Sequence, residues 1–474
     1  MGATGEFVRQ LTTTGWNPAW SPDGREIVFS TEGISRHPFD RPTRSELWIA
    51  DVETGESRRL TEGDAVQPSW SPNGHRIAYW GLVRGTGQRD IWTISSKGGQ
   101  PRPVTEDATV DWNPVWGERG DYLYYASERG GSMNLWRVAI DESSGELLDE
   151  PEPLAAPSSF ASYASISDDG GRLAYASSSI ERRLYAVAFD PESLKVAGEP
   201  RPIARDLRDV DAPAPSPSGD WLVFSRTGQE DILIAGLDGT QWRQLTDDPA
   251  RDRQPVISPD GREIAFYSNR GGSYEVWVMG FDGSNLRAIT DLPDRTVRYP
   301  FWSPDGERIG FSYPGTSGVL IDVGTSWAEQ VPEELPPYPE AGNSFIPVDW
   351  SPDGSRVSGH LFTASGDRRG VVVVELATGT YEKLTDFGWF PTWMADSEHL
   401  LFMVQDIPSP EGGQGYLLDH RIFVVNRITK EYVEVLSRPG LSVEMPALTP
   451  DNRTLYFVQT SFESDIWLME RGGS

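Results

Sequence analysis

The chain has 474 residues, 37% of them hydrophobic and 11% aromatic, so it is long enough to bury a large core. Its formal net charge of -29 disfavours nucleic acid and anionic membrane surfaces as partners. Because it contains no cysteine, it can form neither disulfides nor thiolate-ligated metal sites.

One sequence unit recurs along the whole chain. Its clearest form occupies Pro18 to Phe29 and reads Pro-Ala-Trp-Ser-Pro-Asp-Gly-Arg-Glu-Ile-Val-Phe. Close copies occupy Pro68 to Tyr79, Pro255 to Phe266 and Pro300 to Phe311, and weaker copies centre on Trp116, Ile166, Pro215, Trp350, Trp393 and Leu448. The ten copies are 42 to 55 residues apart, which is the repeat length of a four-stranded propeller blade.

Each unit predicts four short strands, A to D. Strand A ends at the tryptophan, and Ser-Pro-Asp-Gly predicts the A–B turn. In such a turn Pro presets φ, the Asp side chain accepts from nearby backbone N–H groups, and Gly tolerates a positive φ. Strands B, C and D are exemplified by Ile77 to Tyr79, by Leu47 to Ile49 and by the closing pair Leu60-Thr61.

The two ends of the chain complement each other. The last unit ends after Trp467 to Met469 without a strand D, and the chain begins with Phe7 to Thr12, a strand D without its blade. Joining them covers two exposed edges. We therefore predict an all-β fold: a single β-propeller domain of residues 1–474, with ten four-stranded blades and an N-terminal strand that completes the last blade. Two smaller propellers are the alternative, with Pro332 to Phe345 as the best boundary.

The repeats resemble those of TolB-like propellers. The resemblance rests on the Pro-x-Trp-Ser-Pro-Asp-Gly signature, the loop Ser268 to Gly272 and the tail Asp282 to Thr290, and it covers essentially the whole chain. It implies a bacterial interaction or sensor module with a periplasmic or other extracytoplasmic location. Two alternatives stay open: a channel-based hydrolase or lyase, and a scaffold domain of a larger membrane-anchored or kinase-linked protein.

No catalytic motif is found in the sequence. There is no Gly-x-Ser-x-Gly elbow, calcium loop or glycine-rich phosphate loop. The five histidines form no local metal-binding pair, so we interpret them as surface or structural residues: His37, His75, His360, His399 and His420. We therefore predict a non-enzyme with no catalytic residue, cofactor or metal. The repeated tryptophans, such as Trp20 and Trp302, are expected to wedge between blades.

Strand alternation places the D–A and B–C connections on one face of the propeller. Three long insertions share this face, at residues 31–44, 332–345 and 405–419. The residues that open strand A lie at the channel mouth on the same face and vary between blades, so packing alone does not dictate them. The predicted ligand- or partner-binding residues are Trp16, Trp112, Tyr163, Asp211, Arg253, Arg298, Tyr299, Trp389, Phe390 and Glu444.

The expected partner is a protein, a peptide or a small polar ligand. The acidic charge argues against nucleic acid. No run of about 18 apolar residues occurs, so direct membrane insertion is not expected. We expect a monomer.

Overall fold

The computed structural model describes most of the chain in fourteen stretches. These are residues 9–32, 45–83, 88–107, 109–130, 132–154, 160–167, 169–203, 207–227, 230–248, 250–292, 295–363, 368–404, 420–438 and 441–470.

Each of the ten predicted repeats begins with an antiparallel A–B hairpin, as the sequence predicts. The described strands form eight four-stranded sheets and one five-stranded sheet. Their contacts divide the chain into two compact units. Unit 1 comprises residues 1–180 and 463–474, and unit 2 comprises residues 181–462.

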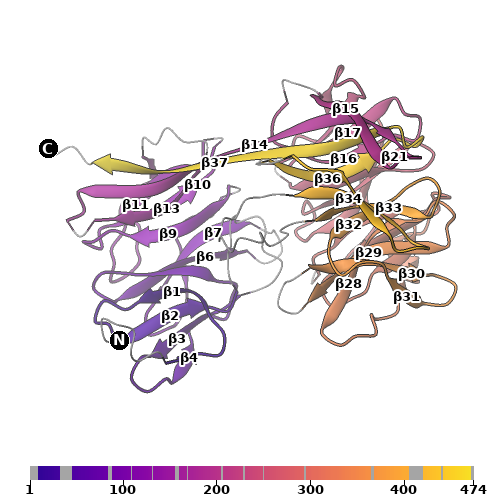
Figure 1. The fold of residues 1–474 in the computed structure, drawn as a ribbon. Helices are drawn as coiled ribbons and strands as arrows, with labels where there is room; N and C mark the ends of the chain where they lie inside the picture. Colours follow the sequence, from indigo (N-terminus) through magenta and orange to yellow (C-terminus); the bar gives the residue numbers. More distant parts are fainter. Residues whose placement is uncertain are drawn as a thin grey trace. The chain divides into compact units, whose positions relative to one another are not determined.

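Unit 1 contains three complete four-stranded sheets and part of a fourth (Figure 1). Its strands are β1 (Trp16–Trp20), β2 (Glu26–Ser30), β3 (Leu47–Asp51), β4 (Ser57–Arg59), β5 (Val66–Trp70), β6 (Arg76–Leu82), β7 (Arg89–Ser95), β8 (Arg102–Pro103), β9 (Asp111–Trp116), β10 (Tyr122–Ser127), β11 (Asn134–Ala139), β12 (Glu152–Pro153) and β13 (Phe160–Ile166). The first strands of its sheets contact one another in the order β1, β5, β9 and β13.

Unit 2 contains five complete sheets and a sixth that begins with β36. Its strands are β16 (Val210–Pro215), β17 (Trp221–Arg226), β18 (Ile232–Gly236), β19 (Arg243–Gln244), β20 (Asp252–Ile257), β21 (Glu263–Ser268), β22 (Glu275–Gly280), β23 (Arg287–Ala288), β24 (Arg298–Trp302), β25 (Arg308–Ser312), β26 (Val319–Asp322), β27 (Glu333–Glu334), β28 (Asn343–Trp350), β29 (Arg356–Thr363), β30 (Arg368–Glu375), β31 (Thr380–Lys383), β32 (Trp389–Trp393), β33 (His399–Val404), β34 (Arg421–Asn426), β35 (Tyr432–Leu436) and β36 (Ser442–Leu448), with one 3-10 turn, η2 (Trp327–Glu329). Its first strands contact one another in cyclic order, from β16 through β20, β24, β28, β32 and β36 back to β16.

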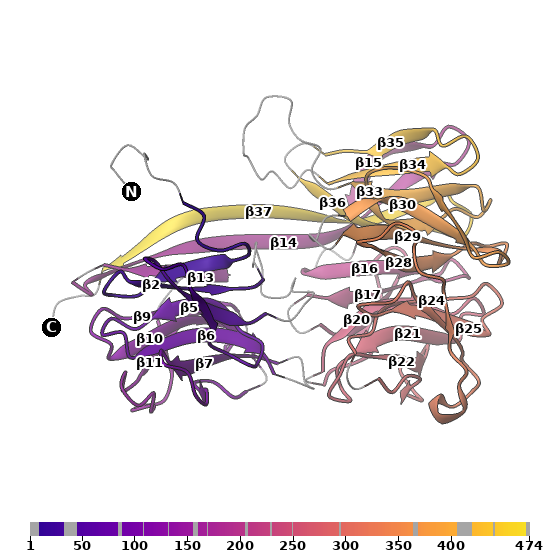
Figure 2. The same ribbon diagram turned by 90° about the horizontal axis from the view of Figure 1, so that it is seen from below.

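Two long strands, β14 (Arg172–Asp190) and β37 (Thr454–Glu470), pass through both units and pair with each other (Figures 1 and 2). In unit 1 the first half of β14 pairs with β13, and Ser178 Oγ donates to Ser464 Oγ of β37 at 3.0 Å. In unit 2 the first half of β37 pairs with β36, and the second half of β14 pairs with β15 (Lys195–Pro202). Each long strand therefore serves as strand B of its own repeat and as strand C of the other.

The predicted single ring of ten blades is not confirmed, because the contacts divide the strands between two units. The sheet of the last repeat is completed by β14 and β15, and not by an N-terminal strand. Residues 9–12 lie in no strand, and residues 1–8 lie outside the described part of the chain. Two units agree with the alternative of two smaller propellers. However, Pro332 to Phe345 is not the boundary, because it lies inside unit 2.

The absence of Gly and Pro explains how the chain crosses between the units. Neither β14 nor β37 contains either residue, so nothing interrupts the strand where the other repeats turn from B to C. The chain therefore changes units in the middle of two strands, and no linker marks the boundary in the sequence.

The Ser-Pro-Asp-Gly turns behave as predicted. In the turn before β25, Ser303 Oγ donates to Asp305 Oδ1 at 2.5 Å, and the backbone N–H of Glu307 donates to the same oxygen at 3.0 Å. These bonds lower the pKa of Asp305, so its carboxylate stays ionised and holds the turn. The same Ser- or Thr-to-Asp bond recurs at Ser21, Ser258, Ser351 and Thr449.

The threonine that closes strand D also has a repeated structural role. Its Oγ1 accepts a hydrogen bond of 2.9–3.0 Å from the backbone N–H at or near the start of strand C. The pairs are Leu47–Thr61, Ile91–Thr105, Ile232–Thr246, Val276–Thr290 and Val371–Thr385. The bond satisfies a buried donor that a valine would leave without a partner.

Five of the six repeated tryptophans are buried, as expected for wedges between blades. They are Trp70, Trp116, Trp302, Trp350 and Trp393, each at most 9% exposed. Trp20 differs, with 58% exposure, although its repeat is nearly identical to that of Trp302. The described residues therefore leave this tryptophan of the first sheet of unit 1 largely uncovered.

Candidate functional site

The first strand of every repeat carries a register shift. It lies at or next to a pair of consecutive residues, such as Trp16 and Asn17, that the sequence places at the channel mouth. In nine repeats the second residue of the pair has a left-handed backbone, with φ between 47° and 57°. These residues are Asn17, Gln67, Asn113, Tyr163, Ala212, Gln254, Tyr299, Phe390 and Met445. The tenth has Pro347, whose ring forbids a positive φ. Such bulges re-aim the adjoining side chains.

The ten predicted binding residues are divided between the two units. Trp16, Trp112 and Tyr163 belong to unit 1, where the buried Trp112 ring lies 5.6 Å from the Tyr163 ring and Trp16 is 59% exposed. The other seven lie in unit 2 and are Asp211, Arg253, Arg298, Tyr299, Trp389, Phe390 and Glu444. We call these seven residues, with the side chains that contact them, the rim cluster of unit 2.

Aromatic side chains form one part of the rim cluster. The ring centroids of Tyr267 and Tyr299 are 6.3 Å apart, and those of Tyr299 and Phe390 are 5.0 Å apart. Phe390 lies 5.0 Å from Trp389, which lies 6.4 Å from the imidazole of His420. All four contacts are edge-to-face, the geometry that aromatic pairs prefer. The arc joins three separate sheets of unit 2.

A buried ion pair stands at one end of this arc. Arg253 binds Glu230 through two hydrogen bonds, from Nε at 2.8 Å and from Nη2 at 2.6 Å, and Arg251 Nη1 lies 3.4 Å from the same carboxylate. Burial acts to lower the pKa of Arg253, but the Glu230 carboxylate outweighs it and the pKa is raised. The paired guanidinium also lies 5.4 Å from the centroid of the Tyr274 ring.

A second charged group of the rim cluster lies at the other end of the arc, next to His420. Arg182 lies between two carboxylates, with Nη1 3.4 Å from Asp211 Oδ2 and Nη2 3.4 Å from Glu444 Oε2. Burial raises the pKa of Asp211. For Glu444 burial acts in the same direction, but Arg182 and His420 outweigh it and lower the pKa to about 2. Glu444 is therefore ionised at neutral pH.

His420, Ser442 and Glu444 combine the residue types of a serine hydrolase, but not their geometry. Ser442 Oγ lies 2.5 Å from His420 Nδ1 and donates to Glu444 Oε1 at 2.8 Å, while His420 Nδ1 lies 2.9 Å from the same oxygen. In a catalytic triad the serine and the acid engage opposite nitrogens of the imidazole. Here both engage Nδ1, and Ser442 is 1% exposed, so the group is not arranged for nucleophilic attack.

Four rim residues were missed or misjudged from the sequence: Arg182, Glu230, His360 and His420. The structure places both histidines in the rim cluster, with His360 5.4 Å from Phe390 and His420 6.4 Å from Trp389, and both are buried. Glu230 and His420 lie in B–C connections, His360 lies in the second half of β29, and Arg182 lies in the middle of β14, and none of these places carries a repeat motif. The sequence offers one indication of their position: strand alternation places the B–C ends of the strands on the same face as the starts of the A strands.

Two of the three predicted insertions, at residues 31–44 and 405–419, lie almost wholly outside the described part of the chain. Within the described residues, no group of three or more His, Cys, Asp or Glu side chains could hold a metal ion. No helix in that part is both long and apolar enough to span a membrane.

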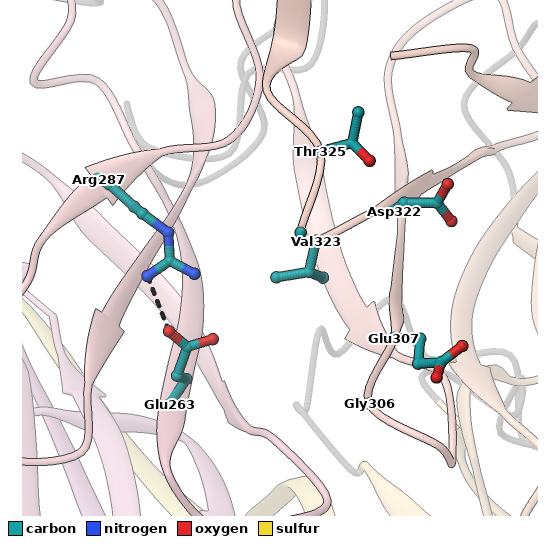
Figure 3. A pocket seen from close by; sticks show the side chains of 8 residues that line it. Glu263, Arg287, Gly306, Glu307, Asp322, Val323 and Thr325 are labelled. Carbon is teal, nitrogen blue, oxygen red and sulfur yellow. Dashed lines mark hydrogen bonds and ion pairs between the residues drawn. The ribbon is translucent and has the colours of Figure 1, made fainter. Parts of the chain in front are cut away.

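A depression of the described surface lies away from the rim cluster. It measures about 620 Å³ and is lined by Glu263, Arg287, Gly306, Glu307, Asp322, Val323, Gly324 and Thr325. Figure 3 shows Glu307 and Asp322 across the depression from the ion pair of Glu263 and Arg287, whose atoms are 2.8 Å apart. These residues belong to A–B and C–D ends of strands, the face opposite the rim cluster.

Parts of the chain are similar to known bacterial proteins. It is 26% identical over 211 residues to the uncharacterized peptidase YuxL of Bacillus subtilis, covering 44% of this chain and 29% of that protein. It is 40% identical over 101 residues to the Tol-Pal system protein TolB of Anaeromyxobacter dehalogenans, covering 21% of each. The chain thus spans less than a third of the length of either relative.

Among solved structures, a putative TolB from Agrobacterium tumefaciens matches 59% of this chain and 98% of its own, at 18% identity and a TM-score of 0.45. The profile of the TolB beta propeller domain, PD40, matches residues 1–196 and 163–324, well over half of the sequence. The chain therefore belongs to the TolB beta propeller domain family.

Proposed function

We propose that the chain is a non-catalytic binding module that engages a protein or peptide at the rim cluster of unit 2. The observation that carries this proposal is that all six sheets of unit 2 contribute to one continuous network at the same strand ends. The contributing residues are Asp211, Arg253, Tyr299, His360, Trp389 and Glu444. Aromatic anchors beside buried, paired charges are typical of protein-binding hot spots.

The similarity of part of the chain to a Tol-Pal system protein supports a protein partner and an extracytoplasmic location as parts of the proposal. The similarity to a peptidase keeps a hydrolase as the rival function. The geometry of Ser442, His420 and Glu444 argues against that rival at the rim cluster. Turnover of esters, peptides or oligosaccharides by the purified chain, abolished by His420→Asn, would support it.

The test is affinity capture from a lysate of the native organism, with the purified full chain as bait. Trp389→Ala removes the central ring of the aromatic arc and is expected to reduce partner capture by about tenfold. The thermal transition should hardly move, because Trp389 is only partly buried.

Trp242→Ala is the matched control. This tryptophan is 46% exposed and precedes β19, so it lies at the opposite strand ends of unit 2. It should leave capture unchanged. Equal capture by the Trp389→Ala and wild-type chains would contradict the proposed site, and a collapsed melting curve of Trp389→Ala would show that the residue is structural.

A further inference from the structure

We infer that the rim cluster of unit 2 binds a dipolar peptide segment, with an acidic side chain at Arg298 and a basic side chain at His420 Nε2. This inference rests on the proposed function, because it assigns the ligand chemistry of the same site. It follows from two side chains that the surrounding network leaves with unused hydrogen-bonding capacity, and from the unequal distribution of charge between them.

His420 is held as a directed hydrogen-bond acceptor. The ionised Glu444 carboxylate lies 2.9 Å from Nδ1 and fixes the ring proton on that nitrogen, so the neutral imidazole carries its lone pair on Nε2. His420 is only 5% exposed, and its Nε2 has no hydrogen-bond partner among the described residues. A buried acceptor without a partner is costly, which points to a donor supplied by a ligand.

Arg298 supplies the opposite chemistry. It opens β24, next to the left-handed Tyr299, and its charge acts on the Tyr267 hydroxyl in the aromatic arc. The described residues provide no ion pair for its guanidinium, whereas Arg251 and Arg253 both bind Glu230. A guanidinium free of carboxylates at a binding surface is suited to an anionic group of a ligand.

The paired charges give the two sides of the rim cluster opposite signs. On one side Arg251 and Arg253 share the single carboxylate of Glu230, and Arg298 has no ion pair among the described residues. On the other side Arg182 faces the two carboxylates of Asp211 and Glu444. The aromatic arc runs from Tyr267 and Tyr299, next to Arg298, to His420, which contacts Glu444. A ligand with one acidic group, one basic group and an apolar centre matches this order.

The experiment measures binding of four fluorescent, end-blocked hexapeptides to the purified full chain by fluorescence polarisation. The peptides share an apolar centre and differ in their two flanking residues, which are Lys with Glu, two Lys, two Glu or two Gln. The Lys–Glu peptide is expected to bind about tenfold more tightly than the other three. Equal affinities, or no binding by any peptide, would overturn the inference.

Two variants assign the ends of the peptide. His420→Asn keeps an N–H near the place of Nδ1 but has no atom at Nε2, and should weaken the Lys–Glu and two-Lys peptides while leaving the two-Glu peptide unchanged. Arg298→Gln should weaken the Lys–Glu and two-Glu peptides and leave the two-Lys peptide unchanged. Each loss is expected to be about fivefold or more. Uniform losses across all peptides would contradict the assignment.

His399→Asn and Arg262→Gln are the matched controls. His399 also pairs with a carboxylate, 2.7 Å from Asp396, but its Nε2 already binds Asn426 and it lies at the opposite strand ends. Both controls should leave all affinities unchanged. If the Trp389→Ala chain loses its captured partner but the peptides do not discriminate, the proposed function stands and the dipolar ligand is wrong.

Discussion

Replacing Trp302 by alanine is expected to destabilise the protein far more than replacing Trp20 by alanine. The two tryptophans occupy the same place in nearly identical repeats, Pro-Phe-Trp-Ser-Pro-Asp-Gly and Pro-Ala-Trp-Ser-Pro-Asp-Gly. Trp302 is 8% exposed, and its Nε1 donates to the Val256 carbonyl of the neighbouring sheet at 3.2 Å. Trp20 is 58% exposed. Because the local sequences are nearly identical, a comparison of the two variants isolates the effect of burial on stability.

The magnitude follows from burial. Truncating a buried tryptophan costs about 3–5 kcal/mol in lost burial and cavity formation. Losing the donor to the Val256 carbonyl adds about 1 kcal/mol. At Trp20 more than half of the side chain is already in water, so the free energy of unfolding should fall by roughly 1 kcal/mol or less.

The assay is urea unfolding followed by circular dichroism, since removing a tryptophan alters the fluorescence signal itself. The chain has two compact units, so the midpoint of each resolved transition is compared instead of one global free energy. Trp302→Ala should lower the midpoint of one transition clearly, and Trp20→Ala should lower none. Equal effects of the two variants would refute the uncovered face at Trp20.

Stability should fall as the pH rises from 5 to 8, because burial raises four carboxyl pKa values to about 6 (Asp111) or about 7 (Asp90, Asp231 and Asp349). The folded protein then holds more protons than the unfolded chain between about pH 4 and 7, so this stabilisation is lost as the pH rises through that window. A melting temperature at pH 8 equal to or above that at pH 5 would contradict this. Thr290→Val should cost about 1–3 kcal/mol in urea unfolding, because it leaves the Val276 N–H and the Glu275 carboxylate without the Thr290 hydroxyl. A cost no larger than that of Thr378→Val, a change at an exposed turn, would show that this hydroxyl contributes little.

The repeat pattern predicts local structure and the face of the site well. All ten A–B hairpins are where the motif places them, because Ser-Pro-Asp-Gly, or the variant of it in a given repeat, encodes the turn in neighbouring residues. The seven predicted residues of unit 2 also fall at the same strand ends, since strand alternation decides the face. These properties depend on a few adjacent residues.

The number of rings depends on long-range pairing, which the motif does not encode. The last repeat was expected to take its final strand from the N-terminus, but β14 and β15 occupy that place. The signal was the lack of Gly and Pro throughout β14 and β37, which left no B–C turn in either repeat. The repeat pattern therefore predicts two short strands, B and C, where the structure has one uninterrupted strand.

The side chains that pair with the predicted charged residues could not be predicted for a related reason. Arg182 is far from His420 and Glu444 in sequence, and it meets Glu444 only because β14 carries it into unit 2. If all four strands of the fourth repeat belonged to one sheet of unit 1, Arg182 would lie in that sheet and not beside Glu444. Arg182 therefore links the binding site to the passage of β14 from unit 1 into unit 2.

Hydrogen–deuterium exchange of the full chain with and without its captured partner tests the binding site most directly. Protection is expected at the starts of β16, β20, β24, β32 and β36 and around His420, where the rim cluster lies. Protection confined to unit 1, or to the depression near Glu263 and Asp322, would place the partner elsewhere and contradict the account.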